Sequence, residues 1–335
     1  MKYKLLGRTG LRVSELCLGT NTFGTEWGIG TDKEGARKIF DTFTEAGGNF
    51  FDTANNYNHG TSEKFLGEFV GHERDQYVIA TKFSMQVGKH MNAGGNGRKH
   101  MRKAVEDSLR RLNTDYIDLL YLHAWDGVTP AEEVVRSFDD LVREGKVNYI
   151  GLSDTPAWVI GRMDLMAELR GWSRVAAMQL EYSLVERSPE RELIPLAKEL
   201  EMAIVAWHAL GAGVLTGKYN KPEGKGRLKE NSKYRTEKNL QVAEEVLKIA
   251  EESGKSPAQV AINWVRQQHP LIIPLIGSSK AEQTKDNIGC LDFELEQEQL
   301  TRLHELSKIA MGFPHEFLHK EGMEETLKND VPRYR

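Results

Sequence analysis

Four side chains able to donate, accept or stabilise a proton follow consecutive apolar segments of this 335-residue chain: Asp52, Tyr57, Lys82 and His123. Taken singly, each has an ordinary reading as a capping aspartate, a packed tyrosine, a surface lysine or a structural histidine. An acid, a phenol, an ammonium and an imidazole at the ends of successive segments instead indicate proton-transfer chemistry.

The expected roles of these groups follow from their acidities. A free tyrosine titrates near pH ~10, which is too high for acid–base work at neutral pH. We expect the Lys82 ammonium to favour the phenolate and to lower the pKa of Tyr57. Asp52 would hold Lys82 charged and oriented, while His123 would hydrogen-bond a substrate carbonyl oxygen. Such a set suits protonation of a carbonyl oxygen as a hydride arrives at carbon.

The elements that must position these residues are visible as short apolar runs separated by helical patterns. Most of the runs are continuous, which is typical of strands buried on both faces of a parallel sheet. Eight strand–helix units without a break in composition predict an α/β fold, a (β/α)8 TIM barrel, in a single domain over residues 1–335. The predicted strands are residues 15–19, 49–52, 77–81, 116–123, 147–152, 175–179, 203–206 and 271–276.

Barrel active sites lie at the carboxyl ends of the strands, so the four side chains are expected to converge on one rim. Several additions to the barrel are also predicted. Residues 1–14 form an N-terminal β-hairpin cap, the helical patterns at 256–267 and 296–310 exceed one helix per strand, and residues 311–335 form a C-terminal tail near the pocket. Long polar segments at 85–98 and 218–235 follow strands and are candidate walls of the pocket.

Composition excludes several classes of protein. Lys and Arg total 45 against 49 Asp and Glu, a net charge of −4, which lacks the positive excess of a nucleic-acid binder. The longest apolar runs fall far short of the ~20 residues that span a bilayer. Two cysteines without a CxxC motif, and no visible secretory signal, indicate a reducing cytoplasm. We expect no metal, no nucleic acid, no membrane and a small-molecule partner, in a monomer or homo-oligomer.

The motifs around the four residues resemble the aldo-keto reductase superfamily over essentially the whole chain. The resemblance rests on Asp-Thr-Ala-Asn-Asn-Tyr at 52–57, Gly-Thr-Ser-Glu at 60–63, Lys82, and Leu-His at 122–123. It extends from Gly-Arg-Thr-Gly-Leu at 7–11 to Gly-Lys-Val at 145–147. By this resemblance, Tyr57 is the general acid, Lys82 and Asp52 tune it, and His123 orients the carbonyl.

The resemblance also implies a nicotinamide cofactor, NADPH with NADH possible. Trp207 matches the aromatic residue that stacks on the nicotinamide, and Lys280 matches a residue able to pair with a 2′-phosphate. Relatives often have Asn where this chain has Asp154. The residues implied in cofactor binding are Thr22, Asp52, Ser153, Asp154, Gln179, Trp207, Leu210, Gly213, Leu215, Gly217, Ser279, Lys280, Gln283 and Asn287.

Aromatic side chains after strands suggest the substrate class. Trp27 and Trp125 follow the first and fourth strands, and Phe313 lies in the tail, which resembles the mobile closing segment of the family. An aromatic-lined pocket favours apolar or aromatic aldehydes and ketones, reduced reversibly to alcohols. Two alternatives stay open: a cofactor-sensing binding subunit with the same barrel and little turnover, and a Schiff-base enzyme with Lys82 as nucleophile.

Overall fold

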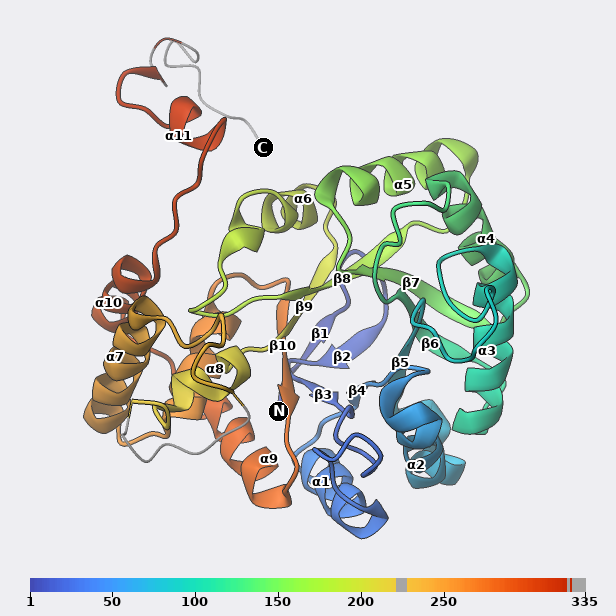
Figure 1. Cartoon of the computed structure of the whole chain (residues 1–335), viewed down its shortest axis with the longest axis horizontal. Helices are drawn as coiled ribbons and strands as arrows, with labels where there is room; N and C mark the ends of the chain where they lie inside the picture. The colour runs from blue at the N-terminus through green and yellow to red at the C-terminus, as the bar shows by residue number, and fades with distance from the viewer. Residues whose placement is uncertain (221–227, 324–325, 327–335) are drawn as a thin grey trace.

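The computed structural model, which describes residues 1–220, 228–323 and 326, has at its centre a closed barrel of eight parallel strands surrounded by helices (Figure 1). This confirms the predicted (β/α)8 fold. Each barrel strand begins and ends within two residues of its predicted bounds. The barrel strands are β3 (Cys17–Gly19), β4 (Phe50–Asp52), β5 (Val78–Phe83), β6 (Ile117–Leu122), β7 (Val147–Ser153), β8 (Val175–Glu181), β9 (Ala203–Trp207) and β10 (Ile272–Gly277).

The strands are mostly apolar because they separate two packed layers. Side chains alternate across a strand, so each strand sends one set of residues inward and the other outward. The inner layer holds small and branched side chains such as Cys17, Ala80 and Val205. The outer layer, which includes Leu120 and Ile150, packs against the surrounding helices. Strand order around the barrel follows the chain, and β10 closes it by pairing with β3.

Helices cover the outside of the barrel, and one assignment of an extra helix needs correction. Of the two helices between β9 and β10, α8 packs on β10, whereas α7 lies outside it against α10. The two long additions are therefore α7 and α10, and not the predicted pair at 256–267 and 296–310. The helices are α1 (Lys33–Glu45), α2 (Thr61–Val70), α3 (Arg98–Leu112), α4 (Ala131–Arg143), α5 (Ala157–Arg170), α6 (Leu193–Glu199), α7 (Glu237–Ser253), α8 (Pro257–Gln267), α9 (Ala281–Ile288), α10 (Gln297–Ser307) and α11 (His315–Leu318).

The predicted hairpin, β1 (Tyr3–Leu5) with β2 (Arg12–Ser14), closes the N-terminal end of the barrel. Leu6 and Val13 are fully buried and belong to the interior layer. Gly7 has φ +55°, and a Cβ there would lie 2.6 Å from the Ala203 nitrogen. Lys4 Nζ donates to the carbonyls of Pro270 and Ile272, both at 3.0 Å. Because this end is sealed, a ligand must enter from the opposite end.

Beyond α10, the chain runs away from the barrel, and α11 lies well outside the ring of helices (Figure 1). The remainder of the predicted 311–335 tail falls partly outside the described residues, as does part of the 218–235 loop. Among the described residues, no helix is long and apolar enough to cross a membrane. In the same part of the chain, no group of three or more His, Cys, Asp or Glu side chains could hold a metal ion.

Candidate active site

The four predicted acid–base side chains meet at the carboxyl ends of β4, β5 and β6. Asp52 is the last residue of β4, Lys82 lies near the end of β5, and His123 follows β6 directly. Tyr57 begins the short 3-10 turn η1 (Tyr57–Gly60) after β4. Lys82 Nζ donates to Asp52 Oδ2 and, at 3.1 Å, to the Tyr57 hydroxyl. It also donates to the Thr53 carbonyl at 2.8 Å, so all three of its protons have acceptors.

Asp52 and Lys82 form an ion pair that is closed to solvent. The second carboxylate oxygen of Asp52 accepts from the Gln179 amide at 2.7 Å, so both oxygens are occupied. Burial raises the pKa of Asp52 above its ordinary value, and Lys82 and Gln179 oppose that rise. Burial lowers the pKa of Lys82, but the charges and hydrogen bonds of Asp52 and Tyr57 outweigh it and hold the pKa above its usual value. Lys82 is therefore a cation at neutral pH.

The pKa of Tyr57 is the opposite of the sequence-based expectation. Burial raises it above the ordinary tyrosine value, and the nearby Lys82 charge only partly offsets that effect. The prediction of a lowered pKa was wrong because it counted the cation and not the loss of water around the phenolate. Tyr57 therefore holds its proton at neutral pH, as a proton donor needs to do.

His123 is a neutral imidazole against the Tyr57 ring. The two ring centroids lie 5.8 Å apart in an edge-on arrangement. Burial, with the Lys82 charge as a second cause, lowers the pKa of His123 to about 3. Its backbone N–H donates to the Phe83 carbonyl at 2.9 Å and to the Ser84 hydroxyl at 3.1 Å, which fixes the residue at the rim. A neutral ring carries one N–H and can donate one hydrogen bond to an oxygen nearby.

The three predicted aromatic walls differ in where they lie. Trp27 packs edge-on against the Tyr57 ring at 5.7 Å and is 37% exposed. Trp125 packs partly buried on the outer core, and its backbone N–H donates to the Asp154 carbonyl at 3.3 Å. The structure does not bring Phe313 to this group, because Phe313 is 86% exposed on the segment that leads to α11.

Two amides next to Tyr57 were not singled out from the sequence. Both side-chain amide atoms of Asn55, and the Oδ1 atom of Asn56, are buried without a hydrogen-bond partner among the described residues. His123 Nδ1 is also buried without a hydrogen-bond partner among the described residues. Buried polar atoms are nearly always paired, so such a cluster marks a place where a ligand or water completes the bonding. The sequence signal that could have identified them is the pair of adjacent asparagines directly before Tyr57.

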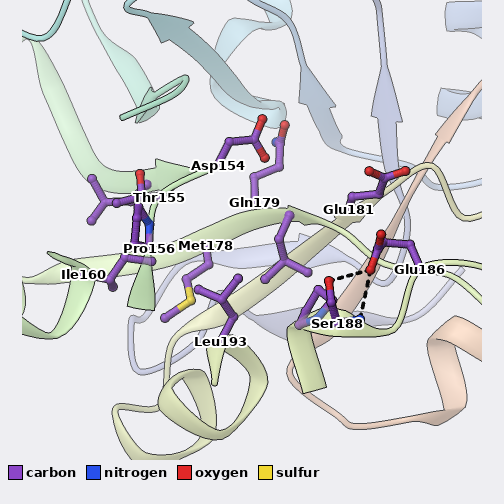
Figure 2. A pocket seen from close by; sticks show the side chains of 13 residues that line it. Asp154, Thr155, Pro156, Ile160, Met178, Gln179, Glu181, Glu186, Ser188 and Leu193 are labelled. Carbon is purple, nitrogen blue, oxygen red and sulfur yellow. Dashed lines mark hydrogen bonds between the residues drawn. The ribbon is translucent and has the colours of Figure 1, made fainter. Parts of the chain in front are cut away.

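The side chains predicted to hold a nicotinamide ring lie at the ends of β7, β8 and β9. Ser153 stands opposite Gln179 in the β7–β8 register, and both are buried. The next residue, Asp154, has a left-handed backbone at φ +40° and bonds the Trp207 side chain. Figure 2 shows the Asp154 and Gln179 side chains lying close together in the lining of a cavity.

That cavity has a volume of about 380 Å³, and side chains from β7, β8 and the segments that follow them line it (Figure 2). Its lining includes the polar residues Asp154, Gln179 and Glu181 and the apolar residues Ile160 and Met178. Burial raises the pKa of the Asp154 carboxyl, and the bond to the Trp207 side chain opposes this rise. The cavity is thus lined in part by two of the predicted nicotinamide side chains, Asp154 and Gln179.

The turn after β9 is tight and rich in glycine. It contains the 3-10 turn η4 (Gly211–Thr216), in which Gly213 has φ +88°. A Cβ on Gly213 would lie 2.9 Å from the Lys218 ammonium, so the glycine lets that cation lie against the turn. The Leu215 side chain is fully buried. The Leu215 backbone N–H donates to the Leu210 carbonyl at 3.3 Å. From the sequence, Lys218 was predicted only to begin a long polar segment that is a candidate wall of the pocket, and not to be a cofactor residue.

The remaining predicted cofactor residues lie at the seam between β3 and β10. Thr22 donates its hydroxyl proton to the Ser278 carbonyl at 2.5 Å and so ties the loops after these two strands together. Ser279 N–H donates to the Gln283 side chain at 3.0 Å, at the start of α9. Lys280 occupies the N-cap position of that helix. The remaining predicted residues of this segment and turn are Asn287, which is buried in α9, and Gly217, which ends the turn after β9.

Comparisons with known proteins agree with this arrangement. A model of the Aldo/keto reductase family matches residues 15–308. Aryl-alcohol dehydrogenase [NADP(+)] of Phanerodontia chrysosporium is 38% identical over 332 residues, covering 91% of this chain and 86% of that protein. Norsolorinic acid reductase of Aspergillus flavus is 36% identical over 325 residues, covering 94% and 83%. The matched region contains every strand of the barrel and all four acid–base side chains, and the chain is an oxidoreductase that belongs to the aldo/keto reductase family.

Proposed function

We propose that this protein reduces aldehydes and ketones to alcohols with NADPH, reversibly, and that Tyr57 is the acid and base. The observation that carries the proposal is the contact of the Tyr57 hydroxyl with the buried Lys82 ammonium at 3.1 Å, beside the His123 ring. A protonated phenol, a fixed cation and a neutral hydrogen-bond donor then face one point on the barrel rim. This combination suits the conversion of a carbonyl to an alcohol better than nucleophilic attack by Lys82, whose three protons are all engaged.

The residues present fit a nicotinamide dinucleotide. Trp207 offers an aromatic face, and Gln179 and Ser153 offer amide and hydroxyl groups at the neighbouring strand ends. The glycine-rich turn after β9 suits a pyrophosphate, because Gly213 lets the Lys218 ammonium lie against the turn. Lys280 at the α9 N-terminus suits a 2′-phosphate. When bound, the reduced nicotinamide supplies the hydride. One relative bears NADP(+) in its name, and we propose NADPH as the cofactor here, with NADH possible.

The chain's own groups supply the proton. His123 donates a hydrogen bond to the substrate carbonyl oxygen and so orients it toward Tyr57. As the carbonyl carbon gains a hydride and its oxygen becomes negative, the Tyr57 O–H bond breaks and that proton forms the alcohol O–H bond. The resulting phenolate is stabilised by Lys82 at 3.1 Å, whose charge Asp52 maintains. In the reverse direction, Tyr57 takes the alcohol proton back.

We propose aromatic or apolar carbonyl compounds as the substrate class. Trp27 stands edge-on to Tyr57, and a flat ring beside a tryptophan gains contact area at little entropic cost. The two relatives described above are named for an aryl alcohol and for norsolorinic acid. We further place the protein in the cytoplasm, because Cys17 and Cys290 are both buried free thiols.

The experiment that tests the function measures NADPH oxidation with benzaldehyde in the wild-type protein and in Tyr57→Phe. We expect Tyr57→Phe to lose turnover by about 10³-fold, because the proton donor is gone. NADPH affinity, read by fluorescence titration, should stay unchanged. Tyr116→Phe is the matched control, since the Tyr116 hydroxyl donates to Asp75 far from the rim.

Two results would contradict the proposal. Full turnover by Tyr57→Phe would remove the mechanism. Tight NADPH binding by the wild-type protein without measurable turnover of benzaldehyde or any other aldehyde would favour the cofactor-sensing binding subunit. Trapping of a covalent adduct on Lys82 with borohydride would instead favour the Schiff-base reaction.

A further inference from the structure

The turn that carries Tyr57 continues through an unusual buried residue. Asn58 has no exposed surface and a left-handed backbone, with φ 45° and ψ 45°. Asparagine tolerates this conformation better than most residues other than glycine. A residue that needed only to make the turn would be glycine, so the Asn58 side chain calls for a reason of its own.

That reason lies in three hydrogen bonds to one neighbouring segment. This segment, residues 21–31, follows strand β3, and we call it the β3 segment. The Asn58 amide donates to the Asn21 carbonyl at 3.0 Å and to the Phe23 carbonyl at 3.2 Å. Its oxygen accepts from the Trp27 backbone N–H at 3.0 Å. Three of the four bonds available to an amide therefore go to the backbone of this single segment.

The β3 segment is itself wound tightly around Asn58. Gly24 has φ +119°, and a Cβ there would lie 2.7 Å from the Asn58 Cβ. The segment closes on itself through Gly24 N–H to the Thr31 carbonyl at 3.0 Å. A second tie at the surface joins Glu26 to the Thr61 hydroxyl. Asn58 makes the buried connection to the segment. It holds the segment at Trp27, whose side chain packs against Tyr57.

We propose that Asn58 is the positioning residue that fixes Trp27 over Tyr57 and thereby selects flat aromatic carbonyl compounds over small aliphatic ones. This rests on the proposed function for its substrate part. The three side-chain hydrogen bonds of Asn58 all go to the β3 segment, and none goes to Tyr57, Lys82 or His123. Asn58 acts through Trp27, because the bond to the Trp27 backbone sets where the indole ring stands, 5.7 Å from the Tyr57 ring.

The test uses Asn58→Gly, because glycine keeps the left-handed backbone and removes only the side-chain bonds. Asn113→Gly is the matched control: Asn113 is an exposed residue at the end of α3 with φ 52°. Hydrogen exchange of the β3 segment is measured in both variants without any substrate. We expect exchange to accelerate about tenfold or more in Asn58→Gly, because the net contribution of one hydrogen bond changes an opening equilibrium by about tenfold. Exchange should stay unchanged in Asn113→Gly.

Kinetics with NADPH supply the second readout. In Asn58→Gly, KM for benzaldehyde should rise about tenfold, while KM for propanal, kcat and the NADPH affinity change less than about twofold. The double variant Asn58→Gly with Trp27→Ala should be no worse on benzaldehyde than Trp27→Ala alone, since both changes remove the same contact.

The proposal is overturned if Asn58→Gly matches Asn113→Gly in both exchange and KM. It is overturned equally if the benzaldehyde and propanal losses are the same size, or if the losses from Asn58→Gly and Trp27→Ala add. Failure of the proposed function looks different: the wild-type protein would turn over neither aldehyde. The exchange measurement would then still decide whether Asn58 holds the β3 segment.

Discussion

The two ends of this barrel use the same strands in opposite ways. At the N-terminal end, charged side chains of the hairpin bond to the barrel and its helices. Lys4 bonds two carbonyls, and Arg8 bonds the Asp164 carboxylate and the Leu200 and Val175 carbonyls. At the carboxyl end, Asn55 and His123 keep buried polar atoms without partners among the described residues. One end completes its bonding within the chain, and the other leaves it for a ligand.

Backbone conformation follows the same division. Six of the non-glycine residues with positive φ lie beyond the carboxyl ends of barrel strands, namely Asn58, His59, Ser84, Asp154, His208 and Ala212. Such conformations cost about 1 kcal/mol or more each and persist where the surrounding structure enforces them. The comparison teaches that positive-φ residues and unmet hydrogen bonds gather at the open end, whereas polar side chains at the sealed end are paired within the chain.

The largest expected effect distinguishes the two ends with one type of substitution. Lys82→Met should lower kcat/KM by about 10³-fold, and it should destabilise the fold by about 3 kcal/mol by leaving Asp52 buried without its cation. Lys4→Met removes a lysine from the sealed end and should leave kcat/KM unchanged. Steady-state kinetics and urea unfolding measure both. Equal activity losses in the two variants would contradict the division.

A stability effect without an activity effect is expected at the sealed end. Gly7→Ala places a methyl group 2.6 Å from the Ala203 nitrogen and the Glu201 carbonyl, at φ +55°. We expect a loss of about 2–4 kcal/mol in the free energy of unfolding. Gly10→Ala is the control, because a Cβ there meets nothing within 4 Å. Below the unfolding transition, kcat/KM should match the wild type in both, and a large drop in Gly7→Ala would show that the ends are coupled.

The buried His123 should impose a pH dependence on stability. Its folded-state pKa of about 3 lies below the ordinary histidine value, so the unfolded chain binds the extra proton first. Its contribution to stability is therefore present above pH ~6.5 and is lost as pH falls toward 3, by at most about 1.4 kcal/mol per pH unit. His123→Asn should flatten this part of the urea-midpoint profile between pH 6.5 and 4.

The raised pKa of Tyr57 makes a companion prediction for activity in the same assay. With His123 neutral and Tyr57 protonated, carbonyl reduction should vary little between pH 5 and 8. Reduction should fall only at higher pH, as Tyr57 loses its proton. A histidine-like transition near pH 6.5 in kcat/KM would show that the His123 environment differs in solution.

The smallest effect is expected from Phe313. Its side chain is 86% exposed on a segment that leads away from the barrel, so Phe313→Ala should change KM for benzaldehyde by less than about twofold. Trp27→Ala, at the rim, should raise that KM far more. A loss in Phe313→Ala comparable to that in Trp27→Ala would show that the tail reaches the open end during turnover.

Much of the fold could be predicted because the strands are buried on both faces and so are continuous apolar runs. The position of the four acid–base side chains followed from the rule that strand ends share a rim. The sign of the Tyr57 pKa shift could not be predicted, since it depends on how much water the folded chain removes. The roles of Asn58 and Lys218 depend on which segments fold against them, and spacing along the chain does not encode that. The same holds for α7 and α8, which have equally good helical patterns.

The pairing of β3 with β10 has a consequence for how the chain must be made. Leu275 pairs with Cys17, and Thr22 bonds Ser278, so the barrel closes only when the last strand returns to the first. Contacts this distant in sequence form late and slowly. A nascent chain that stops short of β10 therefore has an open sheet with two unpaired edges, and it lacks one side of the proposed cofactor site. Premature termination anywhere before residue 272 should therefore yield a chain that misfolds and is degraded, and not an enzyme of lower activity.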